Sequence, residues 1–155
     1  MLIDELKNIA RNNGIVGAGG AGFPAYAKMT EKADTVILNC VECEPLLKLH
    51  RQLLATHTEE IIQMLDEVRE SFGAKEAVIG IKSEYVTTIK AIEEVIGDFP
   101  NVRICALKAA YPMGDEVVLI YEATGRVIKP GGLPIDENVV VYNVETMYNL
   151  YRAVH

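Results

Sequence analysis

The chain has 155 residues, of which 50% are hydrophobic and 24% are charged, and its formal net charge is −7. This length suits one domain with a sizeable core. The acidic balance argues against a general nucleic-acid binder, whose binding surface would be basic. It also means that an anionic ligand must be held by local positive potential and not by the field of the whole protein.

No apolar run approaches the length of a membrane span, and the N-terminus lacks the apolar stretch of a secretory signal. The three cysteines, Cys40, Cys43 and Cys105, do not form the pattern of a disulfide scaffold. We therefore expect a cytoplasmic protein with no direct membrane insertion, either free or peripheral on the inner face of the membrane as part of a membrane complex.

The first elements in chain order are a helix, a glycine-rich loop and a strand. Apolar residues recur at helical spacing in residues 2–10, which predicts a short amphipathic helix. The loop follows, and Pro24 is expected in the first turn of a helix that contains Tyr26 and Lys28. The β-branched run at residues 34–39 predicts a buried strand.

The next helix is expected at residues 56–73. Thr56 and Glu59 have the spacing of a capping box, and Gly73 is a stop signal. Its predicted apolar stripe consists of Ile61, Met64, Leu65, Val68 and Phe72.

The rest of the chain alternates strands and helices. Strands are expected at residues 77–81, 102–107 and 138–143. Helices are expected at residues 87–97, 114–125 and 144–154, and a turn-rich loop at 129–134. This alternation predicts one Rossmann-like, three-layer α/β domain, with a mostly parallel sheet of about four strands flanked by helices.

The glycine-rich loop contains a literal G-x-G-x-x-G pattern from Gly17 to Gly22. A standard dinucleotide fingerprint follows a strand, whereas this loop follows a helix, so the pattern alone does not indicate that fold. Closely spaced glycines bring backbone N–H groups near an anion, and Lys28 could add a positive charge. The alternative is a tight connection in which the glycines only allow close packing.

Mostly polar residues lie at the ends of three of the predicted strands or in the segments that follow them. They are Asn39, Glu42 and Glu44, then Tyr111, Gly114, Asp115 and Glu116, and finally Asn143 and Thr146. Ligands of open α/β sheets bind at the carboxyl ends of strands, so these groups could converge on one crevice. Each also has a simpler interpretation, as solvated acids, as acids near a helix N-terminus, or as helix caps.

Cys40 and Cys43 form a C-x-x-C pattern, which occurs in redox pairs and metal sites. Cys105 is the one further thiol, and the histidines are scattered along the chain. An iron–sulfur cluster generally needs four thiolates. We therefore expect no metal site in this chain.

Four motifs, GAGGAGFP, NCVECEP, YPMGDE and YNVET, occur in this order along the chain. Together they resemble the flavin-carrying subunit of respiratory NADH:quinone oxidoreductase (complex I). The stretches ECEP, YPMGDE and TGRVIKPGGLP are closer still to the C subunit of the Rnf electron-transport complex and to the electron-transfer protein linked to proline reductase. The resemblance covers the chain from Gly14 to its end.

The resemblance implies noncovalently bound FMN, with NADH as the substrate and its nicotinamide stacked on the flavin. Hydride would pass from NADH to the flavin, and single electrons would then leave to an iron–sulfur protein or domain. The chain would be part of an NADH dehydrogenase. Because the flavin would supply the chemistry, no catalytic side chain is expected.

The resemblance also assigns cofactor-binding roles by position. The loop glycines would line the flavin and nucleotide side: Gly17, Gly19, Gly20 and Gly22. Phe23 would pack near NADH, and Lys28 would meet a phosphate or the nucleotide.

The strand-end motifs would supply the other contacts. Those to the ribityl chain of the flavin and to the NADH ribose or amide would come from Asn39, Glu42, Cys43 and Glu44. The flavin would be covered, and the nicotinamide reached, by Tyr111, Gly114, Asp115 and Glu116. Asn143 and Thr146 would hold the FMN phosphate.

The chain departs from the complex I pattern at three positions. Ala18 replaces an arginine and Val41 replaces an acid, as in the Rnf-type branch. Glu31 replaces an aromatic residue, so adenine stacking is less supported than FMN binding.

Family members continue into a ubiquitin-like β domain and a cysteine-rich iron–sulfur domain. We expect this chain to be a fragment that lacks both, so any iron–sulfur clusters would lie in regions absent from it. Two alternatives remain for its function: a plain dinucleotide-binding module without flavin, or a non-catalytic docking domain of the same fold.

Overall fold

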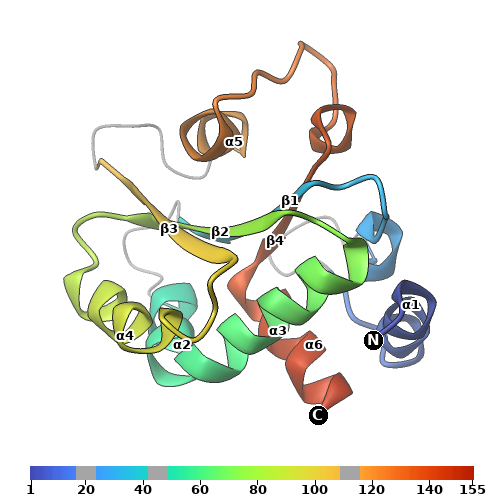
Figure 1. Cartoon of the computed structure of the whole chain (residues 1–155), viewed down its shortest axis with the longest axis horizontal. Helices are drawn as coiled ribbons and strands as arrows, with labels where there is room; N and C mark the ends of the chain where they lie inside the picture. Colours follow the sequence, from blue (N-terminus) through green and yellow to red (C-terminus); the bar gives the residue numbers. More distant parts are fainter. Residues whose placement is uncertain (17–23, 42–48, 109–115) are drawn as a thin grey trace.

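The computed structural model of the chain describes residues 1–16, 24–41, 49–108 and 116–155 (Figure 1). Four strands form one parallel sheet in the order β3-β2-β1-β4. The strands are β1 (Thr35–Cys40), β2 (Glu76–Lys82), β3 (Val102–Leu107) and β4 (Val139–Asn143). The predicted strands, and the parallel sheet built from them, are confirmed to within a residue or so at each end.

Helices cover both faces of the sheet unequally. One side carries α1 (Ile3–Asn12), α2 (Leu49–Thr56), α3 (Thr58–Phe72), α4 (Val86–Ile96) and α6 (Val144–Val154). The other carries α5 (Glu116–Thr124) and the 3₁₀ turn η2 (Pro134–Glu137). Figure 1 shows α5 and the short turn η2 above the sheet, with α2, α3, α4 and α6 below it. The three-layer prediction is confirmed.

The two faces of the strands pack into separate cores. Along β1, Val36 and Leu38 join the larger cluster with α3 and α6, whereas Ile37 joins the smaller cluster with Leu119 and Ile120 of α5. Successive side chains of a strand point to opposite faces, and here both faces are covered. This explains why the strand segments are continuous apolar runs in the sequence.

The predicted capping box of Thr56 and Glu59 is wrong. Thr56 ends α2, a helix that the sequence analysis missed, and α3 begins at Thr58. The hydroxyl of Thr58 donates to the Leu54 carbonyl of α2 at 2.7 Å, so the break between the helices falls at His57. The remainder of the α3 prediction is confirmed. Gly73 ends the helix with φ 71°, and the buried stripe includes Ile61, Met64, Leu65, Val68 and Phe72.

The helix predicted after the glycine-rich loop is shorter than expected. It is a single 3₁₀ turn, η1 (Ala25–Lys28), which Pro24 precedes in extended conformation. Met29 is extended again, with ψ 120°, and its side chain is 3% exposed. Burial of Met29 in the core therefore takes the chain out of the turn and leaves Lys28 at its end.

Two arginines fasten α5 and the segment after it to the sheet. Arg103 of β3 pairs with Glu76 of β2 at 3.0 Å and donates to the Ala123 carbonyl near the end of α5. Arg126, which follows α5, pairs with Asp34 at 2.6 Å.

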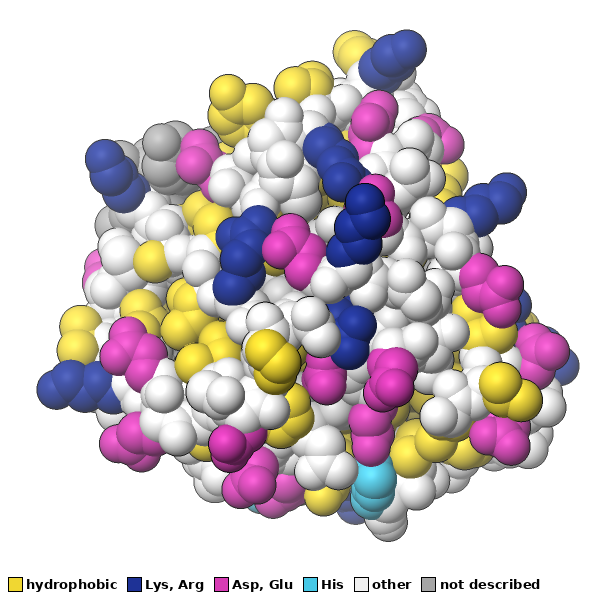
Figure 2. All heavy atoms as spheres, in the orientation of Figure 1, with side chains coloured by type: hydrophobic (Ala, Val, Ile, Leu, Met, Phe, Trp, Pro, Cys, Tyr) yellow, Lys and Arg dark blue, Asp and Glu magenta, His cyan; other side chains and the backbone are white. Residues whose placement is uncertain are grey.

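Figure 2 shows basic and acidic side chains interspersed on the face in view. None of the described helices is long and apolar enough to cross a membrane.

Candidate functional site

The strand order reverses between β1 and β4, because β2 and β3 lie on one side of β1 and β4 lies on the other. Open α/β sheets bind ligands at the carboxyl ends of strands at such a reversal. Asn39 and Asn143 are register partners at these two strand ends. The structure thus brings two of the predicted site residues together.

The side chain of Asn39 shapes the exit from β1. Its Oδ1 accepts a hydrogen bond from the backbone N–H of Val41 at 2.9 Å. This local turn is typical of asparagine. The oxygen therefore supports the turn, and the amino group of the same carboxamide is the part that can donate to a ligand.

Asn143 and Thr146 cap helix α6. The Oδ1 of Asn143 accepts from the backbone N–H of Thr146 at 2.8 Å, as in a standard N-cap. The Thr146 hydroxyl, in a side chain that is 1% exposed, donates to the Val16 carbonyl at 3.3 Å. The capping interpretation from the sequence is confirmed, and the phosphate contact stays a prediction.

The two ends of the glycine-rich loop lie beside this helix start. Val16 and Pro24 form an isolated antiparallel bridge, and the Ala25 N–H donates to the Ile15 carbonyl at 3.0 Å. The loop therefore leaves and re-enters the described structure at one place, which the contact from Thr146 fixes next to α6.

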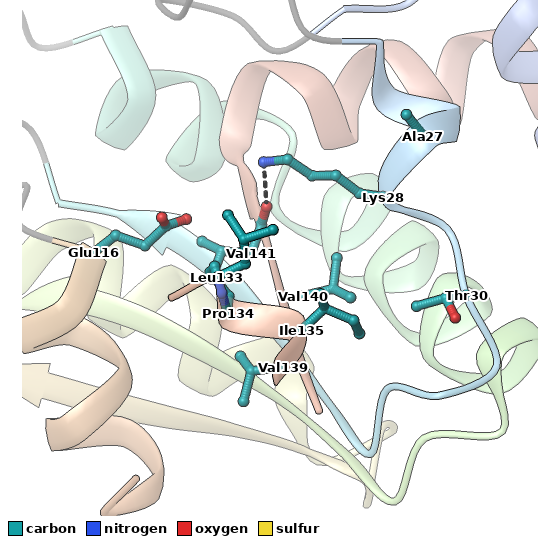
Figure 3. Close-up of a pocket in the computed structure, with 10 residues that line it drawn as sticks. All are labelled: Ala27, Lys28, Thr30, Glu116, Leu133, Pro134, Ile135, Val139, Val140 and Val141. Atoms are coloured by element: carbon teal, nitrogen blue, oxygen red, sulfur yellow. Dashed lines mark hydrogen bonds between the residues drawn. The ribbon is translucent and has the colours of Figure 1, made fainter. Parts of the chain in front are cut away.

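A cavity of about 460 Å³ lies along β4, between η1 on one side and α5 with η2 on the other. Its walls are mainly apolar, and its polar side chains come from Lys28, Thr30 and Glu116. Figure 3 shows the Lys28 and Glu116 side chains reaching toward the same end of the cavity from opposite sides. The volume is in the range of small-molecule sites, roughly 300–1,000 Å³. The full lining is Ala27, Lys28, Thr30, Glu116, Leu133, Pro134, Ile135 and residues 139–141.

The ammonium group of Lys28 rests on β4. Its Nζ donates to the Val141 carbonyl at 3.1 Å (Figure 3) and lies 5.7 Å from the ring centroid of Tyr142. The Tyr142 hydroxyl donates to the Ala25 carbonyl at 3.2 Å. The sequence analysis did not identify Tyr142, since an aromatic residue inside a strand gives only a core signal.

Gly80 of β2 is a second residue that the sequence analysis missed. A Cβ at this position would lie 2.3 Å from Cδ1 of Leu119, so the missing side chain lets α5 pack closely on the sheet. Glu116 is the first residue of that helix, and the packing of α5 brings it to the cavity. A glycine within a strand is the signal that points to such a close approach.

The other predicted site residues lie outside the described part of the chain. They are Gly17, Gly19, Gly20, Gly22, Phe23, Glu42, Cys43, Glu44, Tyr111, Gly114 and Asp115. The described members, Lys28, Asn39, Glu116, Asn143 and Thr146, fall into two neighbouring groups, at the β4 cavity and at the ends of β1 and β4.

Two of the three cysteines, Cys40 and Cys105, lie in the described part of the chain. Cys40 is buried and Cys105 is half-buried, and burial raises the pKa of the Cys105 thiol although the positive charge of Arg103 partly opposes this. Within residues 1–16, 24–41, 49–108 and 116–155, no group of three or more His, Cys, Asp or Glu side chains could hold a metal ion.

Comparison with known proteins identifies relatives for almost the whole chain. The chain is 40% identical over 149 residues to the cobalamin reductase PduS of Citrobacter freundii, covering 96% of this chain and 33% of the relative. It is 37% identical over 155 residues to the C subunit of the Na(+)-translocating ferredoxin:NAD(+) oxidoreductase complex of Acetobacterium woodii, covering 97% and 35%. The chain thus spans about a third of the length of these curated relatives.

A solved structure and a family model agree with this result. A chain of the NAD+-reducing NiFe hydrogenase matches 98% of this chain with 30% of its own length, at 25% identity and a TM-score of 0.81. The model of the Nuo51 FMN-binding domain matches residues 10–152. The chain therefore belongs to the family of the Nuo51 FMN-binding domain, and its relatives include the C subunit of an Rnf-type complex.

Proposed function

We propose that this domain binds FMN and transfers electrons from NADH through the flavin to an iron–sulfur protein or domain. The observation that carries the proposal is that Lys28 and Glu116, from motifs far apart in the sequence, line one cavity along β4, the strand that borders the switch point of the sheet. Open α/β sheets hold nucleotides at the carboxyl ends of the strands beside such a switch point, and β4 ends there at Asn143.

The residues of the cavity fit a flavin nucleotide. Its valine, leucine and isoleucine walls suit an aromatic ring system, and its volume suits part of a dinucleotide or a flavin. Lys28 supplies a positive charge for a phosphate group. Because the net charge of the chain is −7, such a positive charge must be provided locally. Glu116 supplies an acceptor for an amide or a ribose hydroxyl.

In this proposal the chain binds and orients the flavin and the nucleotide. When bound, FMN would supply a centre that accepts a hydride and releases electrons one at a time. Lys28 would exchange its bond to the Val141 carbonyl for a bond to a ligand anion. Asn39 and Asn143 hold the carboxyl ends of β1 and β4 through the turn and the cap that they form. The apolar walls would exclude water from the bound ring.

The relatives support the choice of NADH and of the partner. NAD(+) is named for the Acetobacterium woodii complex and for the hydrogenase, and ferredoxin is also named for the former. The matched region is about a third of these chains. We therefore propose that the iron–sulfur group that accepts the electrons lies outside this chain. We likewise propose that any link to a membrane is through a larger complex and not through direct insertion.

Reconstitution with FMN tests the proposal. The purified chain should retain FMN through gel filtration, show a flavin spectrum with quenched fluorescence, and lose its visible flavin absorbance when NADH is added without oxygen. Tight NADH binding without FMN uptake would instead select a plain dinucleotide module. Binding of neither nucleotide, together with stable binding to an iron–sulfur partner, would select a docking domain.

A matched pair of lysine variants tests the site. Lys28→Met should weaken FMN or NADH binding by about tenfold, the factor that corresponds to ~1.4 kcal/mol of lost charge interaction. Lys32→Met removes the same charge from an exposed position in the same segment and should bind like the wild-type chain. Equal affinities for the two variants would contradict the assignment of Lys28.

A further inference from the structure

Tyr142 is a buried polar residue of β4 with a specific partner. Its side chain is 2% exposed and lies in the larger core cluster. Burial raises the pKa of its phenol, so the hydroxyl stays protonated and able to donate. The acceptor is the Ala25 carbonyl, at 3.2 Å, in the first residue of η1.

The same side chain also contacts the other end of η1. Lys28 is the last residue of this turn, and its Nζ lies 5.7 Å from the Tyr142 ring centroid. This separation is within the range of a cation–π contact, about 6 Å. One tyrosine thus contacts both ends of the turn that carries the cation of the cavity.

Neighbouring contacts hold the residues before and after the glycine-rich loop against α6 and β4. The Thr146 hydroxyl holds Val16, just before the glycine-rich loop, and Lys28 itself donates to the Val141 carbonyl. Tyr142 lies between these two attachment points in the sequence of β4 and α6. The residue before the loop is therefore held by a side chain of α6, and the segment after the loop is held on β4 by the Tyr142 hydroxyl and by the bond from Lys28.

We propose that Tyr142 is a positioning residue of the flavin site: its hydroxyl fixes the Ala25 carbonyl, and its ring holds the Lys28 ammonium beside the cavity. This inference rests on the proposed function, since Lys28 is the residue through which Tyr142 acts on the ligand. It assigns no catalytic role to the phenol, which is buried among core residues.

Removal of one hydroxyl tests the first contact. Tyr142→Phe should weaken FMN binding by about fivefold, the factor for a typical neutral hydrogen bond of ~1 kcal/mol. It should also speed amide hydrogen exchange at Ala25, Ala27 and Met29, whose N–H groups bond within and around the turn. The matched control is Tyr121→Phe, which removes a hydroxyl from a side chain of α5 that is 51% exposed and should change neither quantity.

A double-mutant cycle tests the second contact, because a merely structural role would be additive. Tyr142→Leu removes both ring and hydroxyl, and Lys28→Met removes the cation. If the ring acts through Lys28, the effect of Tyr142→Leu on FMN affinity should be about twofold to fivefold smaller in the Lys28→Met background. Additive effects in chains that remain folded by circular dichroism would refute the role of the ring.

The outcomes separate this inference from the proposed function. If the wild-type chain binds no FMN, the proposed function fails, and with it any role of Tyr142 in a flavin site. Exchange rates in the ligand-free chain would still show whether the hydroxyl fixes the turn. If the wild-type chain binds FMN and Tyr142→Phe matches it in both affinity and exchange, the inference is overturned while the proposed function stands.

Discussion

Substitution of Gly80 by alanine should loosen the packing of α5 on the sheet. The new Cβ would lie 2.3 Å from Cδ1 of Leu119, more than 1 Å inside ordinary contact distance. Overpacking of a core typically costs about 1–3 kcal/mol. Replacing a strand glycine by alanine recovers roughly 0.5–1 kcal/mol of backbone entropy. The difference of these two ranges is about 0–2.5 kcal/mol, and we therefore expect Gly80→Ala to lower the free energy of unfolding by about 1 kcal/mol.

Urea unfolding followed by circular dichroism measures this effect, and a second substitution identifies its cause. Leu119→Ala alone leaves a cavity and should cost about 2–4 kcal/mol. In the double variant the clash is absent, so its loss of stability should be about 1 kcal/mol smaller than the sum of the single losses. Gly97→Ala, where a new Cβ meets nothing within 4 Å, is the control and should be neutral or slightly stabilising. Strict additivity of Gly80→Ala and Leu119→Ala would refute the close-approach argument.

Three further predictions concern the described site and its supports. Asn143→Ala removes the N-cap of α6 and should lower the free energy of unfolding by ~1 kcal/mol in the same urea assay, whereas Asn143→Asp should retain most of it. Thr146→Val leaves the Val16 carbonyl without this donor and should cost about 1–2 kcal/mol, and Thr146→Ser should behave like the wild-type chain if the hydroxyl is responsible. Burial opposes ionisation of Asp34, but its bonds to Arg126 and Thr35 outweigh this and lower its pKa, so its contribution to stability should be lost as the pH falls below about 4. The advantage of the wild-type chain over Asp34→Asn should therefore shrink on acidification, and a constant difference from pH 7 to pH 3 would contradict this assignment.

The strands and most helices could be predicted because their signals are local. A parallel strand covered on both faces gives an uninterrupted apolar run, as in β1 and β4. The cap formed by Asn143 and Thr146 is also readable, since it lies within four consecutive residues. The α2 helix was missed because its pattern directly adjoins α3, and the break at His57 depends on the side chain of Thr58.

The site contacts could not be predicted because they join distant segments. Lys28 meets Val141 only once η1 lies along β4, and Glu116 reaches the cavity only once α5 packs on the sheet, where Leu119 lies close to Gly80. The resemblance of the motifs predicted which residues bind the cofactor, but it did not predict that the Tyr142 ring lies against the Lys28 ammonium. Its two contacts depend on the fold of the whole chain.

A crystal structure of the chain grown with FMN would test the central claim most directly. We predict flavin density in the cavity along β4, with Lys28 released from the Val141 carbonyl and within hydrogen-bonding reach of a ligand oxygen, and with Glu116 at the same end. Flavin bound on another face, or a cavity that stays empty in a chain saturated with FMN in solution, would contradict it.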